Sequence, residues 1–551
     1  MNNTISFYHK LLIFFTVFLF CTNMFAKDYF VHPKTGSDKN TGVSKKQAFK
    51  SLKRASKIDY KPGDRLVLAH GETYTNGLTI INKKGTALKP IIISSVSWDS
   101  KENLSPAVID FKGQPNGILI EDSSFLEISN IQLRANGYFE DFMQNSKMRC
   151  AILLRNSMSN AMEHLTIKNV TVNNIYYENS GFKRGKDEVK TANGTQKYGW
   201  GIRVMNKTTA IIDHIKIINC SINNVSHTGI KLTGTNKNIS NVEILNNVVK
   251  NTGGPGIQMS GVKSVYVANN LVSHSGSADD TRKWGRGSGL WTWSSSQVLI
   301  EKNKFLHASG PGDSAGAHID FNCDNIVLQY NISAYNAGGF CEILGNNYNC
   351  AYRYNISIND GDRVKGKNGA FQEGKIFWLS GYQGNDKKRK GPVNSYFYNN
   401  TIYSDSTIIS KIAIDNTSKG ILIVNNIFYL KGESKAVLGD QYKPDEASGD
   451  LAKNVFFKNN LFLSKKSWPA DIGITDTNPI IGNPKFANKG GLQAKDYTPE
   501  NMFLIKQKGI VIKLLPNDTD GLLQSLELNL KKDILGNSIN TVPSLGAIEP
   551  K

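Results

Sequence analysis

The stretch NVVKNTGGPGIQMS, from Asn247 to Ser260, combines the features that decide the fold of this chain. An asparagine opens a short β-branched run, a glycine-rich turn follows, and GIQMS from Gly256 begins a second short run. Apolar residues on alternating positions of such short runs are typical of β-strands, and asparagine and glycine between runs are typical of turns. The stretch therefore predicts two short strands joined by a turn.

The asparagine run recurs along most of the chain. Successive copies from Asn219 to Asn355 are 28, 23, 33, 28 and 24 residues apart, and all copies begin at Asn169, Asn219, Asn247, Asn270, Asn303, Asn331, Asn355, Asn400, Asn426 and Asn460. One coil of about this length with inserted loops explains the spacing, which indicates a solenoid. Asparagine suits such a bend because it tolerates a left-handed backbone, and stacked amides can form hydrogen bonds along the solenoid.

The second run also recurs after a turn, at Gly201, Gly229, Gly256, Gly289, Ala317, Gly339 and Lys375. Together the two sets of runs predict an all-β stack of short parallel strands. The clearest helical pattern, QAFKSLKRASKI from Gln47, predicts an amphipathic N-terminal capping helix that covers the open end of the core.

The first residues indicate export. Lys10 precedes an apolar stretch from Leu11 to Phe20, and Ala26 offers a small residue at a cleavage point. We therefore expect a signal peptide over 1–26 and a secreted or periplasmic mature protein. No later run is long and apolar enough for a membrane span. We divide the rest into a β-helix over 27–464 and irregular C-terminal coils with a cap over 465–551.

The formal net charge of +20 predicts attraction to a polyanion. An anionic polysaccharide or oligosaccharide suits an exported protein, whereas no nucleic-acid-binding signature accompanies the dispersed basic residues. Solvated surface lysines remain an alternative explanation of the charge. Five cysteines remain after the signal peptide, an odd number without metal-binding spacing, and they are expected to be core residues with one disulfide left open. We expect a monomer.

The N-terminal stretch YFVHPKTGSDKNTG from Tyr29, KPGDRLVLAHGETY from Lys61 and the ending LGAIEP from Leu545 resemble the right-handed parallel β-helix proteins of the pectate lyase-like superfamily. This resemblance spans nearly the whole mature chain. It implies a right-handed parallel β-helix and a carbohydrate-active enzyme, either a glycoside hydrolase or a polysaccharide lyase. It does not decide the reaction, because one fold supports many chemistries.

Alternation along the second runs predicts one chemically active face. If Ile319, Phe321, Cys341 and Ile343 point into the core, His318, Asp320, Phe340 and Glu342 point outward. The same register adds Arg203, Lys231, Gln258, Trp291 and Trp293 to this face. We predict that the tryptophans contact sugar rings and that Arg203 and Lys231 pair with a carboxylate or sulfate. His307 and Arg353 are further candidates for substrate binding, and packing or surface roles remain alternatives for all of these residues.

Asp320 and Glu342 are 22 residues apart, about one coil, and are therefore expected to stack on neighbouring strands. The strand spacing of about 4.8 Å favours a retaining glycoside hydrolase, whose carboxyl groups are about 5–5.5 Å apart. An aspartate followed one coil later by a glutamate after Gly-Phe is also similar to β-helix glycoside hydrolases that include β-xylosidases. That likeness implies Asp320 as nucleophile and Glu342 as acid/base, with His318 hydrogen-bonding the acid or serving as a base.

Two alternatives stay open. A polysaccharide lyase would remove a proton beside a uronate carboxylate with Lys, Arg or His, and Ca²⁺ could neutralise that carboxylate. No cofactor is required by the hydrolase prediction; the Ca²⁺ candidates Asp279, Asp280, Asp360 and Asp362 form no cage in the sequence. The second alternative is a non-catalytic glycan-binding β-helix, which the irregular coils and the dense cluster of acidic, histidine and tryptophan residues argue against.

Overall fold

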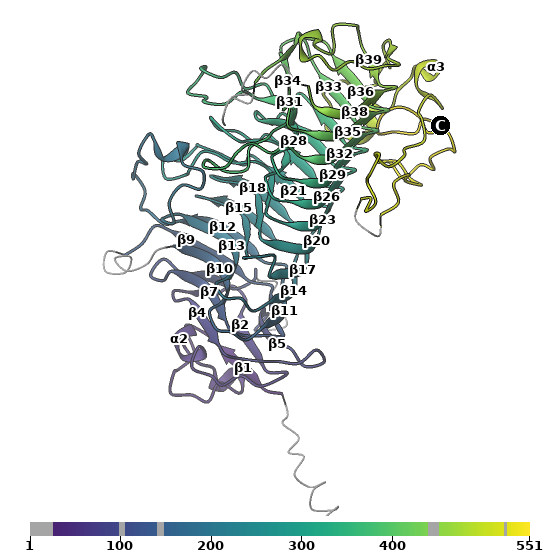
Figure 1. The fold of residues 1–551 in the computed structure, drawn as a ribbon. Coiled ribbons are helices and arrows are strands. Elements are labelled where there is room, and N and C mark those ends of the chain that lie inside the picture. The colour runs from purple at the N-terminus through teal and green to yellow at the C-terminus, as the bar shows by residue number, and fades with distance from the viewer. Residues whose placement is uncertain (1–25, 99–104, 140–147, 439–450, 523–525) are drawn as a thin grey trace, which may run out of the picture.

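The computed structural model describes residues 26–98, 105–139, 148–438, 451–522 and 526–551. The chain winds into an elongated solenoid whose coils stack from the N-terminal end to the C-terminal end (Figure 1). Each full coil adds one strand to each of three parallel sheets, which we call sheets A, B and C. The predicted signal peptide lies outside the described residues except for Ala26.

Neighbouring strands within each sheet are parallel. Sheet A contains, in order, β1 (Asp28–Val31), β2 (Arg65–Ala69), β5 (Ile91–Val96), β8 (Leu126–Ser129), β11 (Met162–Lys168), β14 (Ile212–Ile218), β17 (Ile239–Leu245), β20 (Val262–Ala268), β23 (Ser296–Glu301), β26 (Asp324–Gln329), β29 (Tyr348–Arg353), β32 (Val393–Tyr398), β35 (Lys419–Val424) and β38 (Lys453–Lys458). Sheet B contains β3 (Thr73–Tyr74), β6 (Val108–Asp110), β9 (Gln132–Asn136), β12 (Thr171–Tyr176), β15 (Ser221–Val225), β18 (Val248–Thr252), β21 (Leu271–Ser273), β24 (Lys304–Leu306), β27 (Ile332–Ala334), β30 (Ile356–Ile358), β33 (Thr401–Ser404), β36 (Ile427–Leu430), β39 (Leu461–Phe462) and β40 (Ile480–Ile481). Sheet C contains β4 (Leu78–Ile81), β7 (Asn116–Glu121), β10 (Arg149–Asn156), β13 (Gly199–Asn206), β16 (Ile230–Thr233), β19 (Ile257–Ser260), β22 (Leu290–Trp293), β25 (Ala317–Ile319), β28 (Gly339–Ile343), β31 (Lys375–Leu379), β34 (Ser410–Ile414) and β37 (Ser434–Ala436).

The predicted all-β stack of parallel strands is confirmed. The asparagine runs form sheet B and the second runs form sheet C. The strands of sheet A complete each coil; their alternating burial, as in β14, places every second side chain in the central core. Because all three sheets turn one face inward, isoleucine, valine and leucine of successive coils stack in one continuous core.

Two neighbouring residues of the asparagine turn provide the two predicted features, the left-handed backbone and the stacked side-chain amides. Asn246, immediately before Asn247, has a φ of 57°. Asn247 itself keeps an ordinary backbone and donates from its side-chain amide to the Asn270 side chain at 3.0 Å. The same buried ladder continues through Asn303, Asn331, Asn355, Asn400, Asn426 and Asn460. The ladder thus bonds coil to coil along one corner of the solenoid.

The N-terminal cap is shorter than predicted. Helix α2 (Leu52–Ala55) has one turn, and the Ser51 side chain accepts a hydrogen bond from the Arg54 backbone at 3.1 Å. Phe49 cannot begin this helix because it forms a bridge with Val31 of β1. Leu52 and Ala55 still cover the end of the core. The other described helical segments are η1 (Lys45–Gln47), η2 (Glu188–Lys190), η3 (Ala470–Ile472), η4 (Ala494–Tyr497) and α3 (Met502–Ile505).

The C-terminal segment after α3 returns beside sheet A, as the yellow trace in Figure 1 shows. Tyr398 of β32 donates to the Leu528 carbonyl at 2.7 Å, and the Asn425 side chain donates to the Ile510 carbonyl at 2.8 Å. This segment therefore covers the outer face of the C-terminal strands of sheet A. All five described cysteines are buried and free. Among the described helices, none is long and apolar enough to cross a membrane.

Candidate active site

A pocket of about 360 Å³ opens on the outer face of sheet C. Five consecutive strands, β13, β16, β19, β22 and β25, supply its floor, and loops between strands supply its walls. Seven of the predicted site residues line it: Arg203, Lys231, Gln258, Trp291, Trp293, His318 and Asp320. The remaining lining residues include Asn193, Gln196, Arg286, Asp313, Phe321 and Tyr382.

The register of sheet C places these side chains in rows across the strands. Arg203 pairs with Lys231, Lys231 with Gln258, Gln258 with Trp291, and Trp291 with His318. This row begins with two cations and continues, through an amide and an aromatic residue, toward the acidic end. The pocket is therefore basic at one end and acidic at the other.

The two predicted carboxyl residues do not stand opposite each other. Ile319 of β25 pairs with Ile343 of β28, which aligns Glu342 with His318 and sets Asp320 two residues further along. From a strand spacing of about 4.8 Å and a rise of about 3.3 Å per residue, their Cα atoms are about 8 Å apart. The directly stacked arrangement expected from the 22-residue spacing is wrong, so strand spacing no longer favours a retaining mechanism.

Asp320 is buried and held by two N–H donors. The Trp291 indole donates to Oδ2 at 2.7 Å, and the Phe321 backbone donates to Oδ1 at 2.8 Å. Burial raises the pKa of Asp320 to about 7, a shift that the charge of Asp313 increases and the two donors oppose. A carboxyl group with this pKa can exchange a proton near neutral pH.

Glu342 is 7% exposed and lies beside the pocket without lining it. Burial raises its pKa, with further increases from the negative charges of Asp313 and Asp320 and a decrease from Lys375. Among the described residues, no side-chain donor to the Glu342 carboxyl is found, whereas Asp320 has two donors. Donors stabilise the ionised form of a carboxyl group. When only one of the two groups is protonated, the proton is therefore expected on Glu342.

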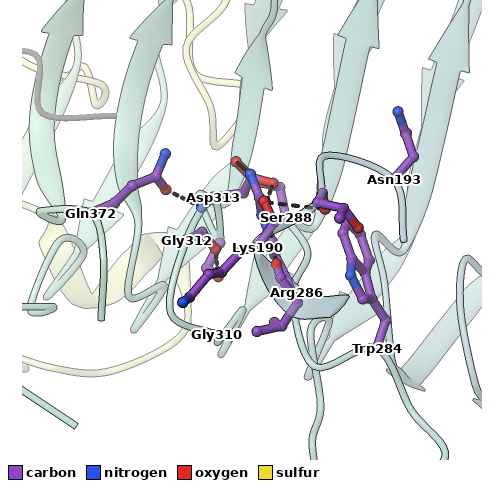
Figure 2. Close-up of polar contacts among 12 residues, drawn as sticks. Lys190, Asn193, Trp284, Arg286, Ser288, Gly310, Gly312, Asp313 and Gln372 are labelled. Atoms are coloured by element: carbon purple, nitrogen blue, oxygen red, sulfur yellow. Dashed lines mark hydrogen bonds and ion pairs between the residues drawn. The ribbon is translucent and has the colours of Figure 1, made fainter. Parts of the chain in front are cut away.

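Asp313 and Arg286 form a buried ion pair at the acidic end. Arg286 donates to both carboxylate oxygens of Asp313, at 2.8 and 3.0 Å. Burial alone would raise the pKa of Asp313, but the charge of Arg286 and its hydrogen bonds outweigh burial and lower it. Figure 2 shows Gln372 directed at Asp313, whose backbone N–H donates to the Gln372 side chain. Asp313 is thus a fixed negative charge in the pocket wall.

His318 is neutral at physiological pH. Burial lowers its pKa to about 4, and its Nδ1 lies 3.0 Å from the Ser288 hydroxyl. A histidine with so low a pKa is a weak base near pH 7. Its position in the row between Trp291 and Glu342 suits a hydrogen-bonding role.

The two tryptophans differ in exposure. Trp291 is 9% exposed and its indole nitrogen is committed to Asp320, so its main effect is to orient that carboxyl group. Trp293 is 40% exposed, and its ring meets Phe321 edge to face at 5.7 Å between centroids. Trp293 therefore offers the aromatic surface that a sugar ring can contact.

Two inward and outward assignments are wrong. Phe321 lines the pocket, because β25 ends at Ile319 and the alternation stops there. Phe340 lies in the core with its ring 5.6 Å from that of Tyr352, after Gly339 with a φ of 134°. Both phenylalanines sit where the strand geometry is interrupted.

His307 and Arg353 lie away from the pocket, so the structure does not support their grouping with it. His307 follows β24 of sheet B and stacks between His274 and Tyr335, at 4.9 and 5.3 Å. Arg353 of β29 in sheet A is buried and donates to the Gln329 side chain and to the Glu527 carbonyl, at 2.8 and 2.6 Å. It fastens the C-terminal segment to sheet A.

Three of the four acidic residues considered for Ca²⁺ have protein partners, and the fourth, Asp362, is exposed. Asp279 pairs with Lys283 at 2.8 Å and Asp280 with Arg282 at 2.6 Å. Asp360 accepts from the Asn336 backbone and side chain, both at 2.9 Å. Over the described ranges, no group of three or more His, Cys, Asp and Glu side chains is arranged to hold a metal ion.

The wall formed by residues 185–198 was missed by the sequence analysis. This loop follows sheet B, and its Asn193 and Gln196 line the pocket. Trp284 donates to the Glu188 carbonyl at 3.2 Å, and Arg286 donates to the Lys190 carbonyl at 3.1 Å. Figure 2 shows Lys190 close to Arg286 and Asn193 on the neighbouring part of the wall. Tyr382, after β31, completes the opposite wall. Loop residues without periodicity carry no register, so the sequence alone does not place this wall at the pocket.

Comparison with known proteins supports the fold. The family model described as right handed beta helix region matches residues 200–376. No curated protein sequence matches the chain. Among solved structures, a GH136 lacto-N-biosidase from Eubacterium ramulus is 17% identical with a TM-score of 0.52, over 74% of this chain and 68% of that one. XylC in complex with xylose is 13% identical with a TM-score of 0.52, over 95% and 98%.

A PL6 family alginate lyase, AlyGC, is 14% identical with a TM-score of 0.51, and the match covers 88% of this chain and 59% of that one. The similar structures thus include a lacto-N-biosidase, a xylose-bound protein and an alginate lyase. At these identities the likeness concerns the fold. Together with the three parallel sheets, it shows that the chain is a right-handed parallel β-helix.

Proposed function

We propose that the protein is an exported glycoside hydrolase that cleaves a complex, anionic polysaccharide or its oligosaccharides, with Asp320 and Glu342 as the reacting carboxyl groups. The observation that carries the proposal is the buried carboxyl pair on adjacent strands, both with raised pKa values, at the acidic end of a pocket walled by Trp293. Glycoside hydrolysis requires two such groups, one protonated and one ionised.

The hydrogen bonds suggest how the roles are divided. Asp320 accepts from Trp291 and Phe321, and these donors favour its ionised form as nucleophile or base. Glu342 is the better proton holder and would protonate the leaving oxygen. Nearby Asp313 stays ionised and helps to keep the proton on Glu342. Ca²⁺ takes no part in this proposal.

The test is incubation of the purified protein with a panel of acidic and neutral polysaccharides, following new reducing ends and the ultraviolet absorbance of unsaturated uronates. Hydrolysis gives reducing ends without absorbance. Glu342→Gln should lower kcat by at least about 100-fold, the usual contribution of a general acid. Near-normal turnover by a folded Glu342→Gln variant would refute the assignment.

A polysaccharide lyase remains the second candidate because of Lys231. Burial, together with the charge of Arg203, lowers the pKa of Lys231 to about 7, which is the range of a lysine general base. In that reaction Lys231 would remove the proton beside a uronate carboxylate that Arg203 neutralises. Absorbance rising together with reducing ends, and lost in Lys231→Met, would select the lyase.

A further inference from the structure

We propose that Arg203, Lys231 and Gln258 form a binding subsite for an anionic group of the substrate, separate from the place of cleavage. This inference rests on the proposed function and extends it. Lys231 and His318 are three strands apart, so the subsite lies about 14 Å along sheet C from the acidic end. The acidic unit of the substrate would then be bound at a distance from the bond that is broken.

The subsite consists of buried cations without an acidic partner. Arg203 is 4% exposed and Lys231 is 7% exposed, yet neither forms an ion pair with any described residue. Arg203 donates through one nitrogen to the Gln196 side chain at 2.9 Å, and its Nε has no hydrogen-bond partner in the part of the chain that the structure describes. Buried charges in proteins are normally paired, so the arrangement calls for an anion.

Gln258 adds a second unsatisfied polar atom. Its side chain is 4% exposed and its Oε1 has no partner among the described residues. Its Nε2 lies 3.5 Å from the Asn193 side chain, at the limit of a hydrogen bond. Arg203 Nε and Gln258 Oε1 are thus buried, unpaired and part of residues that line the pocket. A sugar with a carboxylate or sulfate and a neighbouring hydroxyl group can satisfy both.

An aromatic base holds the cations in place. The Arg203 guanidinium lies 4.3 Å and the Lys231 ammonium 5.0 Å from the centroid of the Trp200 ring. Trp200 in turn stacks on His227 at 4.0 Å. This platform stabilises the cations through the ring face while leaving their donors for a ligand. A planar guanidinium beside an ammonium matches a carboxylate or a sulfate group.

Anion binding should be coupled to proton uptake. The titratable groups around Lys231 are Arg203 on β13, which is positively charged, and His227 before β16. Burial lowers the pKa of His227 well below its usual value, so this ring adds no charge at neutral pH. A bound anion would raise the pKa of Lys231 and draw a proton onto it.

The experiment uses isothermal titration calorimetry of the mature protein with inorganic sulfate and, separately, acetate, each at pH 7.5 in two buffers of different ionisation enthalpy. Sulfate and acetate distinguish a sulfate-binding from a carboxylate-binding subsite. We expect at least one of them to bind with proton uptake. Lys231→Met should weaken this binding about tenfold or more, whereas Lys250→Met, an exposed lysine on β18, should leave it unchanged.

Equal affinity in the wild type and Lys231→Met, or no binding of either anion, would overturn the subsite. A second result would also overturn it: an unsaturated product from the wild type together with complete loss of cleavage in Lys231→Met. Lys231 would then be the base of a lyase. Failure of the proposed hydrolysis would be detected in a different experiment, as near-normal turnover of polysaccharide by Glu342→Gln. That result would leave the anion titrations unchanged.

Discussion

The Tyr352 hydroxyl lies between the two strands that carry the acidic end of the pocket, 3.3 Å from the Glu342 backbone nitrogen. It donates to the Ala317 carbonyl at 2.9 Å. Two residues further along, the Leu344 backbone donates directly to the Ile319 carbonyl at 2.9 Å. The regular spacing of parallel ladder bonds would join Glu342 to Ala317 in the same way. Tyr352 therefore replaces one ladder bond directly beneath Glu342.

Tyr352→Phe should disturb catalysis by moving Glu342. Without the hydroxyl, the Glu342 N–H and the Ala317 carbonyl either remain buried and unpaired or close on each other, which shifts the Glu342 side chain relative to His318. We expect kcat to fall about tenfold with KM nearly unchanged, and stability to fall by about 1–3 kcal/mol.

The readout specific to positioning is the alkaline limb of the pH–rate profile, which should move because the surroundings of Glu342 change. Tyr348→Phe on the same strand is the control, since it removes an exposed hydrogen bond to Asp520. A Tyr352→Phe variant with normal kcat and an unchanged pH–rate profile would show that the Tyr352 hydroxyl does not position Glu342.

The wild-type pH profile should be bell-shaped near neutrality. Asp320 must be ionised, so kcat/KM should fall as the pH drops through about 7, the pKa of its buried carboxyl group. Glu342 must be protonated, so the rate should also fall at higher pH. On an aryl glycoside with a good leaving group, Glu342→Gln should retain activity and lose the alkaline limb of the pH–rate profile.

Nuclear magnetic resonance of the first-formed anomer of the product then decides between retention and inversion.

The periodic parts of the molecule could be predicted from the sequence. Asn247, Asn270 and their equivalents repeat once per coil, and the same repetition placed Lys231, Gln258 and Trp291 on one face. The offset between Asp320 and Glu342 could not be predicted, because a separation of 22 residues does not give the register between their two strands. The register is set by Ile319 and Ile343, and a one-coil count cannot resolve a shift of two residues.

Non-periodic contacts were also beyond the sequence. Tyr352 of sheet A reaches the backbone of β25 and β28 across the core, and Asn193 reaches the pocket from a loop. Arg353 is a predicted substrate-binding residue, but in the structure it donates to the carbonyl of Glu527, which is 174 residues away in the chain. A lone buried cation looks alike in sequence whether it binds a substrate or a distant carbonyl.

Asp313→Asn should shift the acid limb of the profile to lower pH. The negative charge of Asp313 raises the pKa of Asp320, whereas the charge of Arg286 lowers it. The substitution removes the first effect and leaves the second unopposed, so Asp320 should ionise at lower pH. Circular dichroism must show that the variant is folded, because Arg286 loses a buried partner. An acid limb that stays in place or moves upward would contradict this electrostatic account.

Asn303→Ala should break the amide ladder in the middle of the solenoid. The side chain of Asn303 accepts from the Asn270 backbone at 2.9 Å and donates to the Val267 carbonyl at 3.0 Å. Both partners would remain buried, and we expect a loss of roughly 3 kcal/mol from unpaired groups. Asn173→Ala removes only an exposed amide contact with Asn223 and is the control. Equal urea midpoints for the two variants would show that the ladder contributes little.

Lys231→Met should stabilise the protein even as it weakens anion binding. In the folded state the pKa of Lys231 is about 7, whereas in the unfolded chain it is about 10.4, so between these values the unfolded chain binds more protons. The stability of the wild type should therefore rise with pH from about 7 to about 10, and below pH 7 the buried charge should be fully destabilising. Replacing Lys231 by methionine removes this penalty and should raise the free energy of unfolding by at least about 1 kcal/mol at pH 6.

Thermal melts of Lys231→Met and the wild type at pH 6 and pH 9 test this prediction, since the gain in stability over the wild type should be larger at pH 6. A variant that melts below the wild type at pH 6 would mean that Lys231 has a stabilising partner in the folded protein, and an anion would then not be needed to explain its burial.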